Sequence, residues 1–340
     1  MSPGSFIDPT QKYAAKTGSD PSRNGDDWVG DVEFRIPPGE LKRLSAVSNW
    51  RGLSAVGVEW SLIAAGILAV VYWNNLFLYP FLVLWIGARQ HALVVLMHDG
   101  AHRRLHKSKA LNDFVSEVLL AWPMFATTRA YKISHFAHHR FINTDDDPDW
   151  VRKKTAEWEF PKSWCELGRM LFADVLGLKT HQLFAEIADV SKVPESAKVR
   201  VPLYSIARVL YYGLICFFLV RYDLLTCFLL YWIIPLLTWF KVIYRIRGIA
   251  EHFGLSDNAH AQSRTTIPSR FEALFVAPRN VNYHLEHHLY PSVPFYRLPV
   301  LHRLLMASPD YRSHAHVTQT YWGVLRECCG QARAKGAKFA

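Results

Sequence analysis

Histidine is the residue type in this sequence whose spacing most clearly indicates chemistry. Of the sixteen histidines, three lie in HDGAHRRLH at residues 98–106. Two further segments, HFAHH at 135–139 and HLEHH at 284–288, share the spacing His-x-x-His-His although they lie in different halves of the chain. A single His252 follows in RIRGIAEHFG. This repetition points to one shared chemical task.

The spacing has a geometric meaning if these segments are helical. Residues three and four positions apart lie on one face of a helix, so we expect His98 and His102 to project together. The same argument predicts that the three rings of each His-x-x-His-His segment project together. Protonated rings would repel one another, whereas a borderline transition metal binds several neutral imidazoles. The pattern therefore predicts a metal site.

The number of histidines favours two ions. One tetrahedral zinc takes at most four protein ligands, and the candidate ligands exceed that number. They are His98, His102, His135, His138, His139, His252, His284, His287 and His288. Two ions with four or five nitrogens each would use them all. We expect iron, because imidazole suits it and because an imidazole-rich two-metal centre with open positions suits redox chemistry.

The remaining histidines and the nearby carboxylates have less certain roles. His106 continues the helical spacing from His102 and stays ambiguous. We interpret the isolated ones as surface or hydrogen-bonded residues: His91, His181, His260, His302, His314 and His316. Glu251 and Glu286 lack the Glu-x-x-His offset of soluble di-iron proteins. We expect the carboxylates that flank the histidines to orient imidazole N–H groups, or to cap a helix that opens at Pro148; they are Asp99, Asp145, Asp146, Asp147 and Asp149.

Four apolar segments must position these histidines. They cover about 57–73, 76–97, 203–220 and 224–240, each long enough for a membrane helix. Only Asn74 and Asn75 separate the first pair, and residues 221–223 separate the second. Such short connections predict two helical hairpins, which bring all the histidine segments to one side of a membrane. The fold class expected is an all-α multi-pass membrane protein with a helical cap that carries the metal site.

Charge sets the orientation of these hairpins. Lys and Arg gather on the flanks away from the hairpin tips, so the positive-inside rule places the termini and the metal site in the cytosol. We expect a polar N-terminal segment at 1–45, partly disordered, a membrane domain at 46–310 and a cytosolic tail at 311–340. An amphipathic helix is expected within 163–189. The net charge of +10 fits contact with anionic lipids, since no nucleic-acid motif accompanies it.

The sequence resembles the membrane fatty acid desaturase and hydroxylase superfamily, in particular its acyl-lipid and sphingolipid desaturases. The matching motifs are HDGAH, HFAHH, HLEHH and the Glu251-His252 pair, in the same order and topology over roughly residues 40–310. The resemblance implies a non-haem di-iron centre held by the nine histidines, dioxygen as co-substrate and a fatty acyl substrate that gains a double bond. One departure is Gly248, where a subset of the family has an asparagine that reaches the metal through water.

The resemblance leaves the electron source and the reaction outcome open. The sequence has no haem, flavin or ferredoxin motif, so a separate cytochrome b5-like protein or ferredoxin, with its reductase, is expected. The membrane would be a bacterial inner membrane or the endoplasmic reticulum. A hydroxylase or ketolase of the same superfamily acting on an alkane, carotenoid or other hydrophobic substrate is the alternative. A membrane metal-binding or transport protein is an interpretation from outside this class, and a zinc hydrolase is a weaker one.

Overall fold

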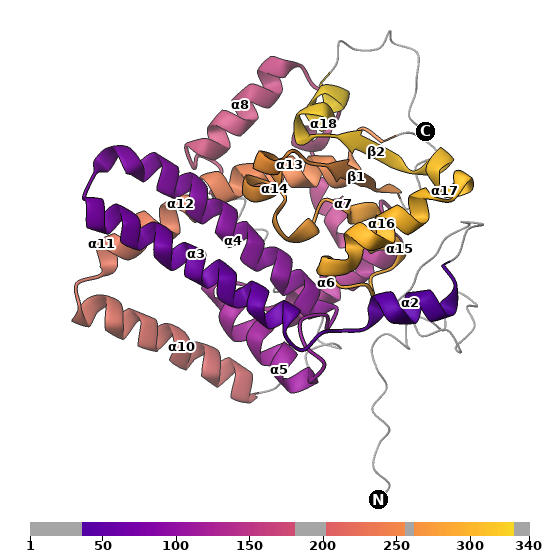
Figure 1. Cartoon of the computed structure of the whole chain (residues 1–340). Helices are drawn as coiled ribbons and strands as arrows, with labels where there is room; N and C mark the ends of the chain where they lie inside the picture. Colours follow the sequence, from indigo (N-terminus) through magenta and orange to yellow (C-terminus); the bar gives the residue numbers. More distant parts are fainter. Residues whose placement is uncertain (1–35, 181–201, 256–261, 330–340) are drawn as a thin grey trace, which may run out of the picture.

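The computed structural model describes residues 36–180, 202–255 and 262–329. Helices dominate this part of the chain. Apolar helices gather on the left of Figure 1, and shorter elements form a cap on the right. The apolar elements are α3 (Arg51–Trp73), η1 (Leu76–Leu78), α4 (Tyr79–Ala101), α10 (Pro202–Arg221), α11 (Leu225–Phe228), η6 (Leu229–Ile233), α12 (Ile234–Leu237) and α13 (Trp239–His252).

The cap is built from segments on both sides of α10 to α13 in the sequence. Those before α10 are α2 (Pro38–Ser45), α5 (Lys109–Phe114), η2 (Val115–Ala121), η3 (Trp122–Met124), α6 (Thr128–Phe141), α7 (Pro148–Lys153), η4 (Ala156–Trp158) and α8 (Trp164–Val175). Those after α13 are β1 (Arg264–Ile267), α14 (Arg270–Phe275), η8 (Pro278–Asn280), α15 (His284–Leu289), η9 (Phe295–Arg297), α16 (Leu298–Met306), α17 (Pro309–His314), β2 (His316–Gln319) and α18 (Tyr321–Cys328).

Four helical spans in the described residues are long and apolar enough to cross a membrane, as the sequence predicted. They are Arg51–Trp73, Leu76–Ala101, Tyr204–Arg221 and Leu225–His252. The second and fourth run past the expected ends at residues 97 and 240. Their last turns are polar yet stay helical, because residues such as Asp99, Lys241 and Arg245 are buried inside the protein. These extensions carry His98 and His252 into the cap.

Helix α4 is the central element of the fold. It packs against α3 on one side and against α13 on another, and it also contacts α6. Gly87 permits the close approach of α13, since a Cβ there would lie 2.9 Å from the backbone nitrogen of Phe240. By contrast, α10 exposes large apolar side chains, including Val209, Leu210 and Phe217. Such a surface suits lipid contact.

Two wide helical turns of π type interrupt regular helices: η2 follows α5 in the cap, and η6 lies between α11 and α12 of the apolar helices. Such turns leave backbone carbonyls without regular helical partners, and an unpaired carbonyl is costly where water is absent. Side chains from other helices satisfy them here. Trp60 donates to the carbonyl of Leu119 at 3.1 Å, and Gln90 donates to that of Trp232 at 2.8 Å. These bonds tie α3 and α4 to the irregular turns.

The end of the described chain is integral to the cap. Strands β1 and β2 pair in parallel, with Arg264 opposite His316. Helix α18 then packs its buried Val324 and Cys328 into a cluster with Ile249, which lies in α13, and Phe253, which follows the last residue of α13. Residues 316–328 therefore support the helix end that carries His252.

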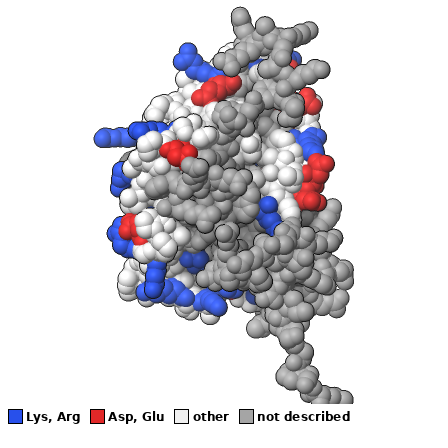
Figure 2. Space-filling model, turned by 90° about the vertical axis from the view of Figure 1, so that its right-hand side faces the viewer, with Lys and Arg blue, Asp and Glu red and all other residues white. Residues whose placement is uncertain are grey.

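The face of the cap that turns away from the α3–α4 connection carries both signs of charge. Figure 2 shows that face, with Lys and Arg gathered along its lower left margin and acidic side chains among basic ones elsewhere. Residues 1–35 of the expected N-terminal segment lie outside the described residues. Within the expected helix at 163–189, α8 has a capping box at Ser163 and Glu166 and exposes Phe172; residues from 181 onward are not described.

Candidate metal centre

The nine histidines predicted from the sequence converge between the apolar helices and the cap. His98 lies in the last turn of α4, and His102 is the residue that ends this helix. Helix α6 carries the three histidines of HFAHH, α15 carries those of HLEHH, and His252 is the last residue of α13. Four separate elements thus deliver side chains to one place.

The nine rings form two groups. The five-histidine group is His98, His102, His135, His139 and His287, and the four-histidine group is His138, His252, His284 and His288. Within each group, one nitrogen per ring lies within 4.8 Å of those of the other rings. The prediction that all three rings of a His-x-x-His-His segment project together was therefore wrong.

Each segment divides its rings in the same way. The first and last histidines, four residues apart, enter one group, while the middle histidine enters the other. Helix geometry explains this division. Position i+4 lies about 40° around the helix axis from position i, whereas position i+3 lies on the other side of position i. His138 of the first segment therefore joins His284 and His288 of the second, and His287 of the second segment joins His135 and His139 of the first.

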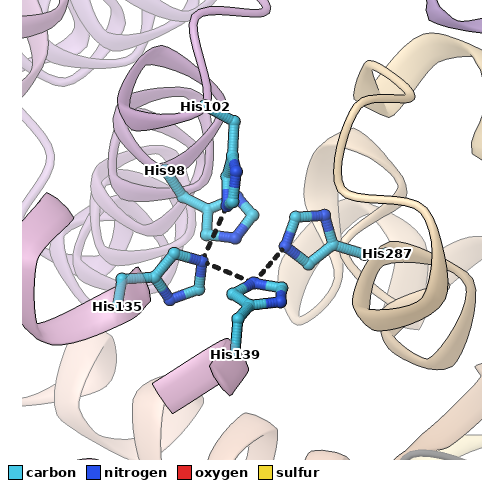
Figure 3. A group of neighbouring side chains, drawn as sticks. All are labelled: His98, His102, His135, His139 and His287. Atoms are coloured by element: carbon cyan, nitrogen blue, oxygen red, sulfur yellow. Dashed lines mark hydrogen bonds between the residues drawn. The ribbon is translucent and has the colours of Figure 1, made fainter. Parts of the chain in front are cut away.

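The ring nitrogens of the five-histidine group are already close together (Figure 3). Nε2 of His135 lies 2.9 Å from Nε2 of His102 and 3.0 Å from Nε2 of His139. Nε2 of His139 lies 3.0 Å from Nε2 of His287. The Nε2 atoms of these four rings, which come from three elements, therefore point at a common centre.

The four-histidine group has the same character. Nε2 of His284 lies 2.9 Å from Nε2 of His252 and 3.0 Å from Nε2 of His288. The ring of His138 stands edge-on to those of His252 and His288, with centroids 4.9 and 5.0 Å away. Rings from α6, α13 and α15 thus enclose a second centre.

Burial favours the neutral form of six of these imidazoles. It lowers the pKa of His102, His135, His139, His284, His287 and His288 well below the usual value, and the neighbouring rings add to the effect. A neutral imidazole has a free lone pair, which is the form that binds a metal. The environment is therefore already suited to ligation.

A buried ring nitrogen without a hydrogen-bond partner shows whether the histidine groups have donors free for a metal. Nε2 of His98 is buried without a hydrogen-bond partner among the described residues, although it belongs to the five-histidine group. A buried nitrogen without a partner is destabilising unless a ligand engages it. Nitrogen donors from neutral rings are also the ligands that iron, zinc and related ions accept. The residues present therefore fit two metal ions.

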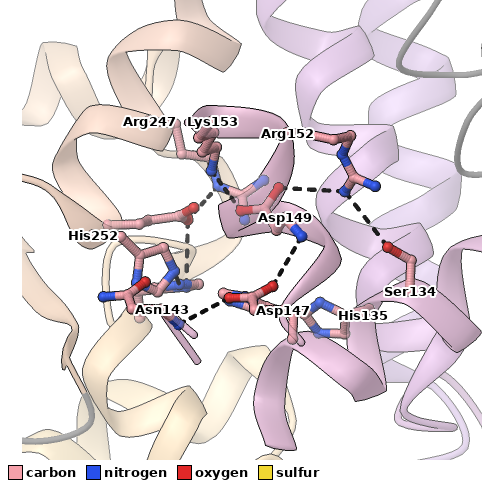
Figure 4. A network of polar contacts seen from close by, with 12 residues as sticks. Ser134, His135, Asn143, Asp147, Asp149, Arg152, Lys153, Arg247 and His252 are labelled. Atoms are coloured by element: carbon pink, nitrogen blue, oxygen red, sulfur yellow. Dashed lines mark hydrogen bonds and ion pairs between the residues drawn. The ribbon is translucent and has the colours of Figure 1, made fainter. Parts of the chain in front are cut away.

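Two of the predicted carboxylates lie beside a grouped histidine: Oδ1 of Asp99 is 3.5 Å from Nδ1 of His98, and Asp147 makes the closer contact, to His138. Asp147 is fully buried and its Oδ2 accepts a hydrogen bond from Nδ1 of His138 at 2.8 Å, while its Oδ1 caps α7 through the N–H of Asp149 (Figure 4). Both roles expected for this segment therefore fall on one residue. The expectation was too broad for Asp145 and Asp149, which pair with Lys154 and Lys153.

Several contacts in the metal centre were missed by sequence reasoning. Oε1 of Glu251 lies 3.3 Å from Nδ1 of His284, and the carbonyl of Gln262 accepts from Nδ1 of His252 at 3.0 Å. The hydroxyl of Tyr131 lies 3.3 Å from Nδ1 of His135. Tyr131 does precede His135 by one helical turn, a spacing that could have indicated the contact; Gln262 had no local signal.

Glu286 supports α15 from behind. Its carboxylate accepts hydrogen bonds from Thr265 and Tyr311 and lies beside Nδ1 of His302. Among the described residues, this carboxylate makes no hydrogen bond to a histidine of either group. It therefore anchors the helix that carries His284, His287 and His288, which sequence reasoning did not predict.

The other histidines lie apart from both groups. His106 accepts a bond from the N–H of Ser108 and belongs to neither. His302, His314 and His316 are hydrogen-bonded, as expected; His181 and His260 lie outside the described residues. His91 corrects the expectation, because it is fully buried and both its ring nitrogens are without a hydrogen-bond partner among the described residues.

Gly248 lies one turn before His252. A Cβ there would lie 2.9 Å from the ring of Trp158. An asparagine at this position would therefore require the indole to move.

Comparison with known sequences decides the family. The sequence model of the fatty acid desaturase family matches residues 74–321, which is most of the chain. The chain belongs to the fatty acid desaturase family. The matched range contains all nine histidines and the whole of three of the four candidate spans.

Individual relatives support this family assignment. The chain is 28% identical over 299 residues to dihydrorhizobitoxine desaturase of Bradyrhizobium elkanii. The aligned region covers 84% of this chain and 83% of the relative. The chain is 29% identical over 133 residues to an Arabidopsis thaliana acyl-lipid omega-3 desaturase (cytochrome b5) of the endoplasmic reticulum, covering 39% and 33% of the two chains. It is 32% identical over 101 residues to a Synechocystis sn-1 acyl-lipid omega-3 desaturase (ferredoxin), covering 29% and 28%.

Proposed function

We propose that this desaturase-family protein introduces a double bond into a lipid-linked fatty acyl chain at a di-iron centre. The observation that carries the proposal is the pair of buried histidine groups at which the ends of two apolar helices meet helices α6 and α15 of the cap. Membership of the family supports the reaction class. The names of the relatives support desaturation, and two of them support an acyl-lipid substrate.

The nine histidines would hold the two ions. His98, His102, His135, His139 and His287 would bind one, and His138, His252, His284 and His288 the other. Bound iron would supply oxidation of an unactivated C–H bond by dioxygen and two electrons. The chain's own part is to fix the orientation of the rings through contacts such as Asp147 to His138. Burial of the groups would also keep water away from the reacting atoms.

We place the centre on the cytosolic side of a membrane, with the four spans forming two hairpins. Support comes from the short connections after Trp73 and Arg221 and from the basic residues that flank the other helix ends. The exposed apolar surface of α10 would face lipid. Glycosylation or labelling of the 74–75 and 222–223 connections from outside the cytosol would test this orientation.

Electrons would come from a separate carrier. Two relatives are named with different donors, cytochrome b5 in one and ferredoxin in the other, and both classes of carrier are candidates for this chain. Because acidic side chains interrupt the basic ones on the cap face, no single docking patch is assigned (Figure 2). Turnover with each purified carrier and its reductase would identify the donor.

Lipid analysis of cells that express the chain tests the proposal. Comparison of the wild type with His135→Ala should show an unsaturated acyl product only for the wild type, because His135 belongs to the five-histidine group. His106→Ala is the matched control, since His106 lies outside both groups, and it should retain the product. The product should also require oxygen.

The outcomes distinguish the alternatives. A hydroxylated product that depends on His135 would favour the hydroxylase reading, which the geometry of the histidines does not oppose. Tightly bound zinc with no oxygen-dependent product, in a sample also grown with ample iron, would contradict an oxygenase. Iron content of about two per chain in the purified wild type would support the di-iron assignment.

A further inference from the structure

The two histidine groups differ in what lies behind their rings. In the four-histidine group, three Nδ1 atoms contact oxygen atoms. Oδ2 of Asp147 lies 2.8 Å from His138, the carbonyl of Gln262 lies 3.0 Å from His252, and Oε1 of Glu251 lies 3.3 Å from His284. Two of these three oxygen atoms belong to carboxylates.

The five-histidine group is supported less closely. The hydroxyl of Tyr131 lies 3.3 Å from Nδ1 of His135, and Oδ1 of Asp99 lies 3.5 Å from Nδ1 of His98. The other oxygen of Asp99 accepts from the backbone N–H of Phe295. Nδ1 of His139 is buried with no hydrogen-bond partner among residues the structure describes. Within the described ranges, no carboxylate lies as close to a ring of this group as Asp147 lies to His138.

Asp147 is held in place independently of any ion. Its side chain is fully buried, and it accepts from the backbone N–H groups of Asn143 and Asp149 at 3.0 and 2.9 Å (Figure 4). Glu251 is paired with Arg247, one turn earlier on α13. Both carboxylates are therefore fixed by α7 and α13 before they contact a ring.

We propose that the two metal positions are inequivalent, and that Asp147 and Glu251 are positioning residues for the four-histidine position alone. This inference rests on the proposed function. A carboxylate that accepts from Nδ1–H fixes the tautomer with Nε2 free, and it makes Nε2 a stronger donor. Loss of such a partner typically weakens metal binding about 10–100-fold. That effect should fall on one ion of the two.

The test measures each ion separately. The purified full chain is loaded without oxygen with ⁵⁷Fe²⁺ alone and then challenged with rising concentrations of a competing chelator. Iron per chain is counted, and Mössbauer spectra resolve the two positions. The variants are Asp147→Asn, Glu251→Gln and Tyr131→Phe. The matched control is Asp145→Asn, a substitution in the same loop at a side chain that is 89% exposed.

Asp147→Asn and Glu251→Gln should each lose one iron at a chelator concentration about 10–100-fold below that needed for the wild type, with loss of the same Mössbauer component. Tyr131→Phe should perturb only the other component, and Asp145→Asn should match the wild type. Glu251→Gln keeps the test decisive if Asp147→Asn misfolds through loss of the α7 cap. Loss of both irons together by folded variants, or retention of both, would overturn the inference. A wild type that binds fewer than two irons would instead overturn the proposed di-iron centre.

Discussion

Burial of imidazole rings is the main feature of this protein at the residue scale. The rings of both histidine groups are removed from water, and Nε2 atoms lie as close as 2.9 Å to one another. Neutral rings tolerate such proximity, whereas protonated rings would not. Stability of the unloaded protein should therefore depend strongly on pH.

Acidification should destabilise the metal-free protein. Burial lowers the pKa of rings such as His102, His135 and His284 in the folded chain, while the unfolded chain keeps values of about 6.5. Below about pH 6.5 the unfolded state therefore binds protons that the folded state excludes, and the free energy of unfolding falls. Melting temperatures in detergent between about pH 8 and pH 5 should decrease as pH falls through this range. Bound divalent metal should reduce the decrease, and a melting temperature that rises on acidification would contradict the argument.

His91 should be dispensable for stability. Its two ring nitrogens are buried without hydrogen-bond partners among the described residues, and such a buried polar group costs roughly 1–3 kcal/mol. Replacement by an apolar residue of similar size, His91→Leu, should therefore leave the melting temperature unchanged or raise it. The comparison is His98→Leu, two turns along the same helix, which should also lower the metal content. A large loss of stability in His91→Leu would indicate an unseen partner such as a bound water.

Extension of helices beyond their apolar segments is the main feature at the element scale. Hydropathy ends the fourth span near Phe240, because Lys241, Arg245 and Arg247 follow. The helix nevertheless continues to His252, since Arg245 pairs with the fully buried Asp174 and Arg247 pairs with Glu251. The existence of four spans and the set of nine histidines could be predicted from the sequence. The helix ends and the division of rings could not, because both depend on partners from distant segments.

Arg264 should be essential to the end of α13. Its buried guanidinium donates to the carbonyls of Ala250, Phe253 and Gly254 and pairs with Glu327 of α18. Arg264→Met would leave these carbonyls unpaired, at about 1–3 kcal/mol for each one that stays dry. We expect a lower melting temperature and weaker metal binding by the four-histidine group.

Two variants separate this role from a general charge effect. Glu327 is partly exposed, so Glu327→Gln should cost no more than about 1 kcal/mol. Arg326→Met changes an exposed arginine of the same helix α18 and should behave like the wild type. Equal effects of Arg264→Met and Arg326→Met would exclude the capping role.

Buried charge joins the apolar helices to the cap at the scale of the whole molecule. Glu59 of α3 is 1% exposed and pairs with Arg89 of α4 at 3.1 Å and with Arg279 of η8 at 2.6 Å. Arg279 also donates to the carbonyl of Ala55. The three side chains thus connect two candidate membrane spans with the segment that leads into α15.

Removal of the shared carboxylate should loosen that connection. Glu59→Gln would leave two guanidinium groups without their anion, and loss of one partner of a buried pair costs roughly 3–5 kcal/mol. Protease accessibility of the cap and the melting temperature in detergent should both report the change. Glu40→Gln, which removes a partly exposed carboxylate that pairs with Arg43, is the control and should have little effect. Similar behaviour of the two variants would show that the buried network is not needed for stability.

The exchange of His138 and His287 between the two groups also sets an order of events during synthesis of the chain. The five-histidine group includes His139 and His287, which are 148 positions apart. The four-histidine group likewise needs His284 and His288 beside His138. Neither group is complete while the ribosome is still translating the residues before 284. In the proposed di-iron centre, each ion would therefore gain its full set of ligands only after residues 284–288 have been synthesised, although four rings of the five-histidine group, His98, His102, His135 and His139, are made earlier.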